Sequence, residues 1–440
     1  MAGRKGTPKA LSDDARRAKN EKIRQSALAT RTRRSAMDCK VYTVKIAKNR
    51  LSNAQKESLE RLFLEAKWVR NALISSGDFT RDNLKNMRES VLVKTPWGVE
   101  SRDVTVLGGQ LAQGVLAEIK TNLKQLSSLK KRGKKVGKLR YSSRVTSVDF
   151  VQHSVSWKMN KSKRKVKLAN IPGWIKVHGL AQLPDDSEYA NAKLVKRDSG
   201  YFLKVTTFVP VRKKSYESGT VIGIDMGVKD GLTFSDGTKI TALFEEPERV
   251  KRLRKKLNRQ VKGSNKYRKT WSLINREMEK LSYKKNDAAQ KIVHELKKNE
   301  YIFFQDENIS SWRKKDSVAR GSKKIHSGIL GRVKAQLKNC ERAMCLDKSV
   351  PTTQLCVCGK RNKIPLSQRI YRCECGYEED RDVHSALNMI RLGMSLEESS
   401  PTLGQSRTPV EFRVRPAQMS FVNVCAGSGT VKREAARSLA

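Results

Sequence analysis

The chain begins its regular pattern with alternating apolar and polar residues and then changes to a helical spacing. The alternation lies in "KVYTVKIAKN" at 40–49, and it predicts a β-strand. Ser52 followed by Gln55 has the pattern of a capping box, which predicts the start of a helix. A second helical stretch is expected at about 105–130. One face of the first helix carries the apolar residues Leu59, Leu62, Phe63, Ala66 and Val69.

Between residues 145 and 210 the pattern is that of short strands separated by turns. Segments such as "TSVDFVQ", "KVKLANI" and "YFLKVTTFVPV" predict a small antiparallel β-barrel. Aromatic residues lie among lysines in and just before this region: Tyr141, Phe150, Trp157 and Trp174. Aromatic side chains can stack on nucleic-acid bases while lysines hold phosphates, or they can form the core of the barrel. Both interpretations are open for each of the four.

From residue 218 the chain changes from two strands to long helices. "VIGID" is a buried-type strand that ends on Asp225, and "GLTFSDG" closes a hairpin with it. Residues 245–261 and 266–298 predict an antiparallel helix pair, and a strand at 301–306 and a short helix in "RDVHSALNMIRLG" follow. The packed face of the helix pair is expected to carry Trp271, Ile274, Met278 and Leu281.

The charge balance of the chain is strongly positive. Lysine plus arginine number 92 against 44 acidic residues, which gives a formal net charge of +48. This charge predicts nucleic acid as the main candidate partner, and a membrane surface is the weaker alternative. No apolar run approaches the roughly 18 residues of a membrane span, and "MAGRKGTPKALSDD" lacks the apolar core of a signal peptide. Residues 1–34, with eleven basic and three acidic residues, are expected to form a disordered or conditionally helical basic arm.

Four of the eight cysteines lie close together in the sequence: Cys356, Cys358, Cys373 and Cys375. In a reducing compartment such a cluster indicates a metal site rather than disulfides. Zinc ribbons normally present two Cys-x-x-Cys turns, and both turns here, "LCVCG" and "YRCECG", are one residue shorter and must be tighter. We expect one structural Zn²⁺; the alternative is four reduced cysteines that support a β-hairpin.

Acidic residues stand at the ends of predicted strands in a chain that has few of them. Asp225 ends one strand, Asp306 and Glu307 end another, and Asp382 is expected at the start of a helix. Carboxylates from such distant segments can meet only through the fold. Together they can hold two Mg²⁺ ions about 3.5 to 4 Å apart, which activate water and stabilise the leaving oxygen in phosphodiester hydrolysis. The alternative for Asp225 taken alone is a turn residue.

Three segments resemble the three split RuvC motifs of TnpB, the transposon-encoded RNA-guided nuclease, and of the compact type V CRISPR effectors. They are "VIGIDMGVKDGLTFSDG", "IFFQDENISSW" and "YRCECGYEEDRDVHSALNMI". "KVYTVKIAKN…LERLFLEAKWVRNALI" also resembles the N-terminal strand and helix of TnpB. The similarity extends over most of residues 40–395. It implies an RNase H-like RuvC nuclease.

The resemblance assigns catalytic and Mg²⁺-binding roles to three acids. Asp225 matches the first catalytic aspartate in "GIDxG", and Glu307 fits the second motif through "ENI". In a competing register Gln305 takes the place of this glutamate, which would indicate a weakened nuclease, and Asp306 is a bystander in both registers. Asp382 matches the second aspartate of the third motif.

The usual form of the third motif is "DRDVNAAxNI", which here reads "DRDVHSALNM". Asp380 matches its first aspartate, and His384 stands where the family has asparagine. In the family the cysteine ribbon lies beside the nuclease centre, and its zinc is not the catalytic metal.

The expected fold class is α/β plus β-barrel, with two lobes. One lobe is a wedge-like β-barrel with an inserted helical recognition segment, and the other is an RNase H-like RuvC domain with an inserted zinc ribbon. The expected parts are a basic disordered arm (1–37), the barrel (38–216) with its helical insertion (about 52–135), the first part of the RuvC domain with the helix pair (217–349), the zinc ribbon for target-strand loading (350–377), the last part of the RuvC domain (378–398) and a C-terminal tail (399–440).

The resemblance implies a Mg²⁺-dependent, RNA-guided DNA endonuclease. Its partners would be a guide RNA, from a transposon end or a CRISPR array, and double-stranded target DNA with a short flanking motif. A monomer in the prokaryotic cytoplasm, associated with the nucleoid and not with a membrane, is expected. Two alternatives are a nuclease-dead, RNA-guided repressor of the same family and a structural RNA-binding protein of ribonucleoprotein type.

The run "LKKRGKKVGKLRYSSR" at 129–144 is a second basic segment. Its lysines and arginines can neutralise phosphates, and its aromatic residue can stack on a base. The candidate nucleic-acid-binding residues are Lys130, Lys131, Arg132, Lys134, Lys135, Lys138, Arg140 and Tyr141.

Overall fold

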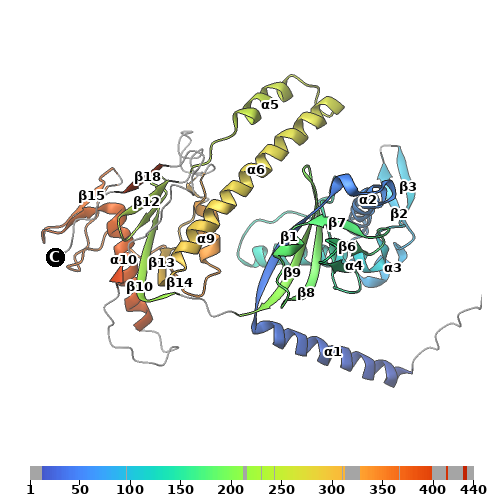
Figure 1. Ribbon diagram of the computed structural model, residues 1–440, viewed down its shortest axis with the longest axis horizontal. Helices are drawn as coiled ribbons and strands as arrows, with labels where there is room; N and C mark the ends of the chain where they lie inside the picture. The colour runs from blue at the N-terminus through green and yellow to red at the C-terminus, as the bar shows by residue number, and fades with distance from the viewer. Residues whose placement is uncertain are drawn as a thin grey trace, which may run out of the picture. The chain divides into compact units, whose positions relative to one another are not determined.

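The chain divides into two compact units, Met1–Lys213 and Lys214–Ala440. The structure is a computed structural model, and Figure 1 labels its helices and strands. The described residues are 12–95, 97–211, 216–228, 230–241, 243–309, 311–312, 328–365, 367–398, 413–414 and 430–433.

The first unit is built on a seven-stranded antiparallel sheet with the order β4-β8-β9-β1-β7-β6-β5. Its two edges approach each other, because Ser154 N donates to Trp157 O at 2.8 Å and the Trp157 indole donates to Ala190 O of β8 at 3.2 Å. The expected barrel is thus present and nearly closed. The strands are β1 (Met37–Ile46), β4 (Ser147–Phe150), β5 (Trp157–Asn160), β6 (Lys165–Leu168), β7 (Ile175–His178), β8 (Glu188–Arg197) and β9 (Gly200–Pro210).

Between β1 and β4 the chain forms the predicted helices. The capping box of α2 is confirmed: Ser52 Oγ accepts from Gln55 N at 3.2 Å, and Gln55 Oε1 accepts from Ser52 N at 3.1 Å. The hairpin of β2 and β3, which turns at Trp97, was not predicted. The elements are α2 (Asn53–Ser76), α3 (Arg81–Asn86), β2 (Ser90–Thr95), β3 (Gly98–Asp103) and α4 (Gly108–Lys131).

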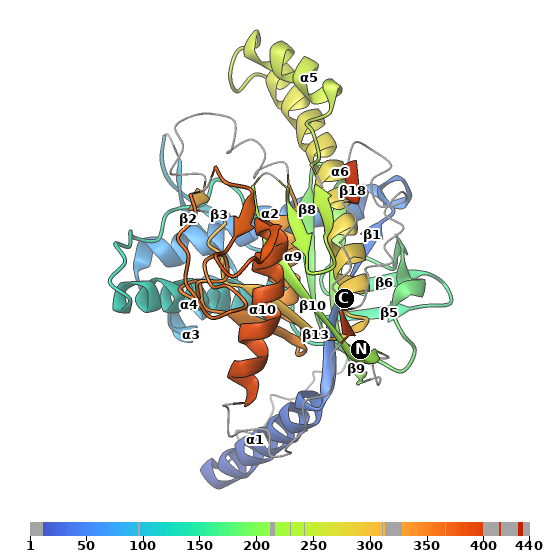
Figure 2. The same ribbon diagram turned by 90° about the vertical axis from the view of Figure 1, so that its left-hand side faces the viewer.

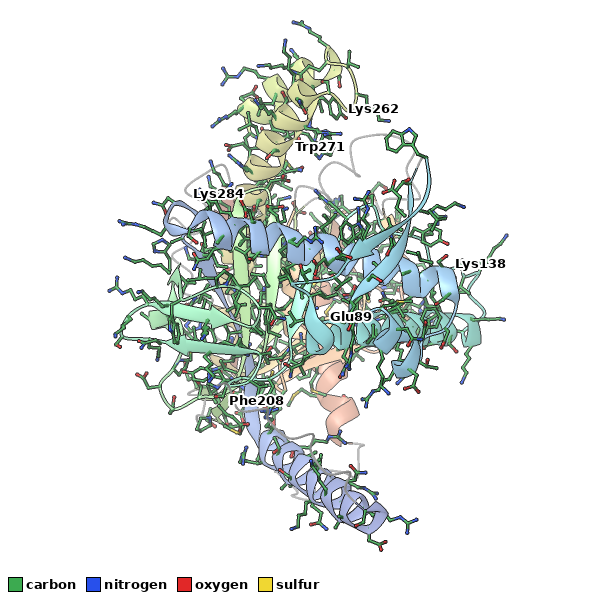
Figure 3. The ribbon with its side chains drawn as sticks, turned by 90° about the vertical axis from the view of Figure 1, so that its right-hand side faces the viewer. Glu89, Lys138, Phe208, Lys262, Trp271 and Lys284 are labelled. Atoms are coloured by element: carbon green, nitrogen blue, oxygen red, sulfur yellow. The ribbon has the colours of Figure 1, made fainter. Side chains whose placement is uncertain are left out.

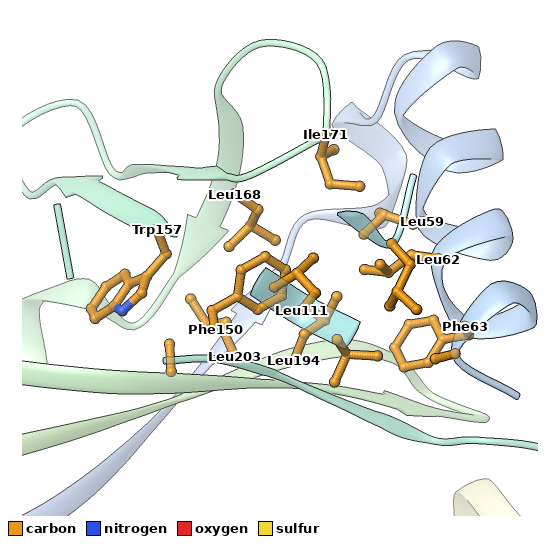
Figure 4. Close-up of a cluster of buried hydrophobic side chains, with 14 of the residues drawn as sticks. Leu59, Leu62, Phe63, Leu111, Phe150, Trp157, Leu168, Ile171, Leu194 and Leu203 are labelled. Atoms are coloured by element: carbon orange, nitrogen blue, oxygen red, sulfur yellow. The ribbon is translucent and has the colours of Figure 1, made fainter. Parts of the chain in front are cut away.

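One apolar core joins the helices to the barrel (Figure 4). Leu62 of α2 and Leu111 of α4 are buried in it together with Leu203 of β9. Phe150 and Trp157 are only 0% and 1% exposed, so the barrel-core interpretation holds for these two and the base-stacking interpretation is wrong.

The described part of the predicted basic arm is helical rather than disordered. Helix α1 (Asp13–Ser35) starts at Ser12, whose side chain accepts from Ala15 N at 3.3 Å. At its end, Arg33 and Arg34 pair with Glu188 of β8 at 3.0 and 2.7 Å. Residues 1–11 of the arm lie outside the described residues.

The second unit is built on a mixed sheet with the order β14-β13-β10-β11-β12-β18, and β17 also pairs with β10. β10, β11 and β12 are antiparallel, whereas β13 pairs in parallel with both β10 and β14. Two short strands of the predicted tail, β17 and β18, belong to this sheet. The strands are β10 (Glu217–Met226), β11 (Leu232–Phe234), β12 (Thr238–Thr241), β13 (Asn299–Gln305), β14 (Ala343–Leu346), β17 (Arg413–Val414) and β18 (Thr430–Arg433).

Helices cover both faces of this sheet (Figures 1 and 2). Ile222 and Ile224 of β10 pack with residues of α6 (Asn265–Leu296) and α9 (Leu330–Leu337). Val221, on the opposite face, packs with residues of β13 and with Met389 of α10 (Arg381–Glu398). The alternation of side chains along a strand therefore assigns each face of β10 to different helices.

Gly223 lies on the α10 face of β10. A Cβ built on Gly223 would lie 1.9 Å from the carbonyl oxygen of Ala386 in α10. The absence of a side chain therefore allows α10 to pack closely against the central strand.

The predicted helix pair consists of α5 (Glu248–Asn258) and α6. Val250, Leu257 and Ile274 form its small apolar core. Trp271 does not join this core as predicted; it is 48% exposed and stacks on Tyr267 with ring centres 6.3 Å apart.

Gly223→Ala should destabilise the second unit by at least about 2 kcal/mol. The added methyl group would meet the backbone of α10, and no rotamer change relieves such a contact. The change is measured as a lower urea midpoint followed by circular dichroism. The control is Gly331→Ala in α9, where a Cβ meets nothing within 4 Å. Wild-type stability for Gly223→Ala would contradict the close packing.

Candidate functional site

Asp225 lies one residue before the end of β10, on the face that α10 covers. Its side chain is half-buried, so part of it stays accessible to solvent. Ser385 Oγ of α10 donates a hydrogen bond of 2.9 Å to Asp225 Oδ1. The helix that covers the sheet thus contacts this carboxylate directly.

Asp382 lies in the first turn of α10 and is only 8% exposed. The Arg381 guanidinium contacts Asp382 Oδ1 at 3.2 Å, and Arg369 Nη1 lies 3.7 Å from Oδ2. Asp380 has a different role: its Oδ1 accepts from the backbone N–H groups of Asp382 and Val383 at 2.9 and 3.1 Å. Asp380 therefore caps the helix that carries Asp382.

The three polar residues at the end of β13 have different surroundings. Gln305 is buried and donates to the Asp347 and Val350 carbonyl oxygens at 3.0 and 2.8 Å. Glu307, two residues further, is half-buried. Gln305 thus binds a loop rather than an acid, whichever register describes the motif.

Asp306 points to two lysines. Lys334 and Lys338 both lie 2.6 Å from Asp306 Oδ1. Their hydrogen bonds and charges lower the pKa of Asp306 to about 2. These contacts support the prediction that Asp306 is a bystander.

Asp382 and Glu307 both act electrostatically on Asp225. The pKa of Asp225 is raised to about 7, first by burial, then by the negative charge of Asp382 and, to a smaller extent, by that of Glu307. The Ser385 hydrogen bond and the Arg381 charge act in the opposite direction. The fold has therefore brought the predicted acids near enough for their charges to interact; their catalytic roles stay a prediction.

These acids suit divalent cations. Partly buried carboxylates that repel one another are stabilised by a shared positive charge, and Mg²⁺ prefers such oxygen ligands.

The four clustered cysteines form a compact group, because their sulfur atoms all lie within 4.8 Å of one another. Cys356 Sγ lies 3.6 Å from Cys375 Sγ, and Cys358 Sγ lies 3.7 Å from Cys373 Sγ. Sulfurs around a tetrahedral zinc, with Zn–S bonds of about 2.3 Å, are about 3.8 Å apart. The four thiols therefore fit one Zn²⁺.

Each cysteine pair lies on a tight turn that ends in glycine. Gly359 N donates to Cys356 O and Gly376 N to Cys373 O, both at 3.0 Å. Both glycines have positive φ angles, 86° and 88°. The expected tightening of the shortened turns is thus confirmed. The backbone N–H of Cys375 also lowers the pKa of Cys373.

His384 connects α10 to the cysteine region. Its buried ring stacks on Tyr371 of β15 (Ile370–Arg372), with ring centres 3.8 Å apart. Burial and the Arg391 charge lower the pKa of His384 to about 4, so it is neutral at physiological pH. His384 therefore packs against the strand that pairs with β16 (Glu378–Asp380) and does not bind the acids.

The predicted nucleic-acid-binding run begins in the last turn of α4, with Lys130 and Lys131, and continues after it in the first unit. The eight candidate side chains are all exposed, and Tyr141 is 64% exposed. Arg70 donates to Arg140 O at 3.3 Å, and Asn71 exchanges two hydrogen bonds with the backbone of Ser142. The backbone is thus fixed on α2 while the charged groups face solvent; Figure 3 shows Lys138 among them.

The described helices include none with the length and apolar character needed to cross a membrane.

The pH dependence of stability should reveal the raised pKa of Asp225. The folded state holds this proton more tightly than the unfolded state, so stability falls as pH rises from about 4 towards about 7. In Mg²⁺-free buffer at about pH 8, Asp225→Asn should be more stable than wild type by on the order of 2 kcal/mol. Millimolar Mg²⁺ should raise the thermal midpoint of wild type only. If the stability of wild type and of Asp225→Asn depended on pH in the same way, this electrostatic description would be wrong.

Metal analysis by mass spectrometry should find one zinc per chain. Cys356→Ser removes the buried ligand and should abolish retention of zinc, because the three remaining thiolates leave the tetrahedral site open. Cys39→Ser, an exposed cysteine outside the cluster, is the control and should keep the metal. A wild-type protein without zinc would support reduced cysteines instead.

Comparisons with known proteins match two parts of the chain to families. Residues 203–301 match the OrfB_IS605 family, described as "Probable transposase". Residues 332–389 match the family "Cas12f1-like, TNB domain". The first range contains β10 and the helix pair, and the second contains the cysteine cluster and Asp382.

Two relatives carry the name "Putative RNA-guided DNA endonuclease". The protein from Streptomyces pristinaespiralis is 23% identical over 270 residues, and InsQ from Escherichia coli (strain K12) is 22% identical over 270 residues. These alignments cover 58% and 56% of this chain and 65% and 66% of the relatives, slightly less than two thirds of each relative.

Two solved structures were also matched. A Cas12f1–sgRNA–target DNA complex has a TM-score of 0.44 and 13% identity, covering 80% of this chain and 99% of that one. A CRISPR–Cas12f ternary complex has a TM-score of 0.26 and 14% identity, covering 80% and 81%. The family matches and the named relatives confirm the predicted resemblance of this chain to TnpB and the compact type V CRISPR effectors.

Proposed function

We propose that the protein is an RNA-guided DNA endonuclease that hydrolyses phosphodiesters at the Asp225 site. The observation that carries this proposal is the placement of Asp225 against α10, where the charges of Asp382 and Glu307 help to raise its pKa. A protein gains no stability from such a group of acids. Binding of catalytic cations would neutralise these acids and explain why the fold places them together.

Each residue of the site has a chemical role in this proposal. Asp225, Asp382 and Glu307 would hold two Mg²⁺ ions, which would supply positive charge at the attacking and leaving oxygens. Ser385 orients Asp225, and Arg381 orients Asp382 through the contacts described above. Arg369, which is partly exposed, is placed to attract the phosphate of the strand that is cut.

The topology of the second unit supports an RNase H-like RuvC domain. A meander of three antiparallel strands is followed by two parallel ones, with helices on both faces. Asp225 lies on the central strand of this sheet. We propose that residues 217–349 and 378–398 form this domain and that 350–377 form a zinc ribbon that loads the target strand.

A surface for nucleic acid is proposed on the α5–α6 helix pair. Residues 248–269 contain eleven lysines and arginines against one acidic residue. Trp271 is exposed beside them and can stack on a base. Figure 3 shows Lys262, Trp271 and Lys284 along this pair. We propose guide RNA and double-stranded target DNA as partners, with the guide supplying sequence specificity and the protein recognising a short flanking motif.

A nuclease-dead, RNA-guided repressor is the second candidate. Gln305 favours it, because in the competing register an amide replaces a metal-binding glutamate. The position of Glu307, whose charge acts on Asp225, favours the nuclease. Sequencing the RNA that co-purifies with the protein supplies the guide with which both candidates can be tested.

Adjacent variants at the end of β13 should decide the register. With the matching guide and Mg²⁺, Glu307→Gln and Asp225→Ala should each lower plasmid cleavage by at least about a hundredfold. Asp306→Asn is the control and should stay within a fewfold of wild type, because Asp306 contacts lysines and no acid. Guide RNA binding should persist in all three. Equal cleavage by wild type and Asp225→Ala would contradict the nuclease proposal.

Salt titrations should reveal which basic surface binds RNA. Each lost phosphate contact should lower the slope of log affinity against log salt by about 0.7 to 0.9. The triple Gln variant of Lys255, Lys256 and Lys262 tests the helix pair, and the triple Gln variant of Lys130, Lys134 and Lys138 tests the run that begins in the last turn of α4. A slope unchanged from wild type would exclude the surface concerned.

A further inference from the structure

The hydroxyl group that holds Asp225 belongs to a buried pair. Ser385 Oγ lies 2.9 Å from Asp225 Oδ1 and 3.1 Å from Thr352 Oγ1. Ser385 and Thr352 are 0% and 2% exposed. Water therefore cannot replace either hydroxyl, and the second hydroxyl limits how the first one can turn.

The pair continues to β13 through Gln305. The single hydroxyl proton of Thr352 can be donated either to Ser385 Oγ at 3.1 Å, while Ser385 donates to Asp225, or to Gln305 Oε1 at 3.3 Å. The Gln305 amide nitrogen donates to the carbonyl oxygens of Asp347 and Val350 at 3.0 and 2.8 Å. Gln305 thus uses both ends of its side chain within the protein. A glutamate at this position would place an acceptor against two carbonyl oxygens, so the network requires the amide.

Helix α10 fixes the other end of the loop that carries Thr352. Asn388 Nδ2 donates to Thr352 O at 2.7 Å and to Leu355 O at 2.6 Å. Arg391 Nη2 donates to Cys356 O at 2.9 Å. The loop is therefore fastened along the helix as far as the first cysteine turn. Asp225 is thereby connected through side-chain hydrogen bonds to the metal-binding turn.

This connection depends on a residue that departs from the family pattern. The quoted motif "DRDVNAAxNI" has two alanines in a row, and Ser385 aligns with the first of them. An alanine there would give Asp225 no hydrogen bond from α10.

We propose that Ser385 and Thr352, supported by Gln305, are positioning residues that hold the Asp225 carboxylate in the orientation needed for cation binding. They touch neither cation nor substrate. Without them, a half-buried carboxylate near like charges can turn away from Asp382 and Glu307. This inference rests on the proposed function, and it gives Gln305 a role in an active nuclease.

The test is Mn²⁺ binding to the full-length, zinc-loaded protein, followed by electron paramagnetic resonance. Ser385→Ala and Thr352→Val should each weaken binding about threefold to tenfold, the effect of one lost hydrogen bond. The double variant should be no weaker than Ser385→Ala, because both changes break the same connection. Thr352→Ser keeps the hydroxyl and should stay within about twofold of wild type.

Controls separate positioning from general stability. Ser395→Ala changes an exposed serine on the same helix and should bind Mn²⁺ as wild type does. Zinc content should be equal in all variants. In cleavage assays the Mg²⁺ concentration for half-maximal rate should rise by the same factor, whereas the rate at saturating Mg²⁺ should stay nearly constant.

Two results would overturn the proposal in distinguishable ways. If Asp225→Asn abolishes Mn²⁺ binding but Ser385→Ala and Thr352→Val bind as wild type does, positioning by the hydroxyls is wrong and the proposed function stands. If wild type and Asp225→Asn bind Mn²⁺ equally, the proposed function fails and the positioning role fails with it.

Discussion

The arrangement of the site in the second unit depends on the repulsion between a half-buried carboxylate, Asp225, and the negative charges of Asp382 and Glu307. Burial, together with the charges of Asp382 and Glu307, raises the pKa of Asp225 to about 7. Such an arrangement costs folding free energy unless a cation or a proton neutralises it. The surrounding sheet has to be rigid enough to keep the acid in place, and its apolar packing on both faces provides that rigidity.

Helix α10 supplies most of the residues that hold the site together. The sequence of α10 places Asp382 in its first turn, Ser385 against Asp225 and Met389 in the apolar core. Asn388 and Arg391 bind the loop before and at the first cysteine turn. Because a helix repeats every 3.6 residues, a single short segment can connect the sheet, the acids and the metal-binding turns. Close contact at Gly223 makes this possible.

Sequence patterns predicted the features that depend on local spacing. The capping box at Ser52, the helix pair and the cysteine cluster all follow from residues that are near one another in the chain. Burial of individual aromatic residues could not be predicted. Periodicity shows which residues share one face of a helix or strand, but not whether another element packs on that face. Trp271 has the spacing of a core residue, but it stays 48% exposed and stacks on Tyr267 of the same helix.

The polar network around Asp225 was also beyond sequence reasoning. Thr352 and Ser385 are 33 residues apart, and only the fold brings their hydroxyls together. Gln305 indicated a damaged site when the motif was considered alone. Its contacts with the loop that carries Thr352 give it a structural purpose.

Anomalous X-ray diffraction from crystals of the zinc-loaded protein grown with Mn²⁺ tests the central claim most directly. Data collected at the manganese edge should show two peaks about 4 Å apart, bounded by Asp225, Glu307 and Asp382. Data at the zinc edge should show a separate peak among the four cysteines. Absence of any manganese peak at Asp225, in crystals that show the zinc peak, would contradict the account.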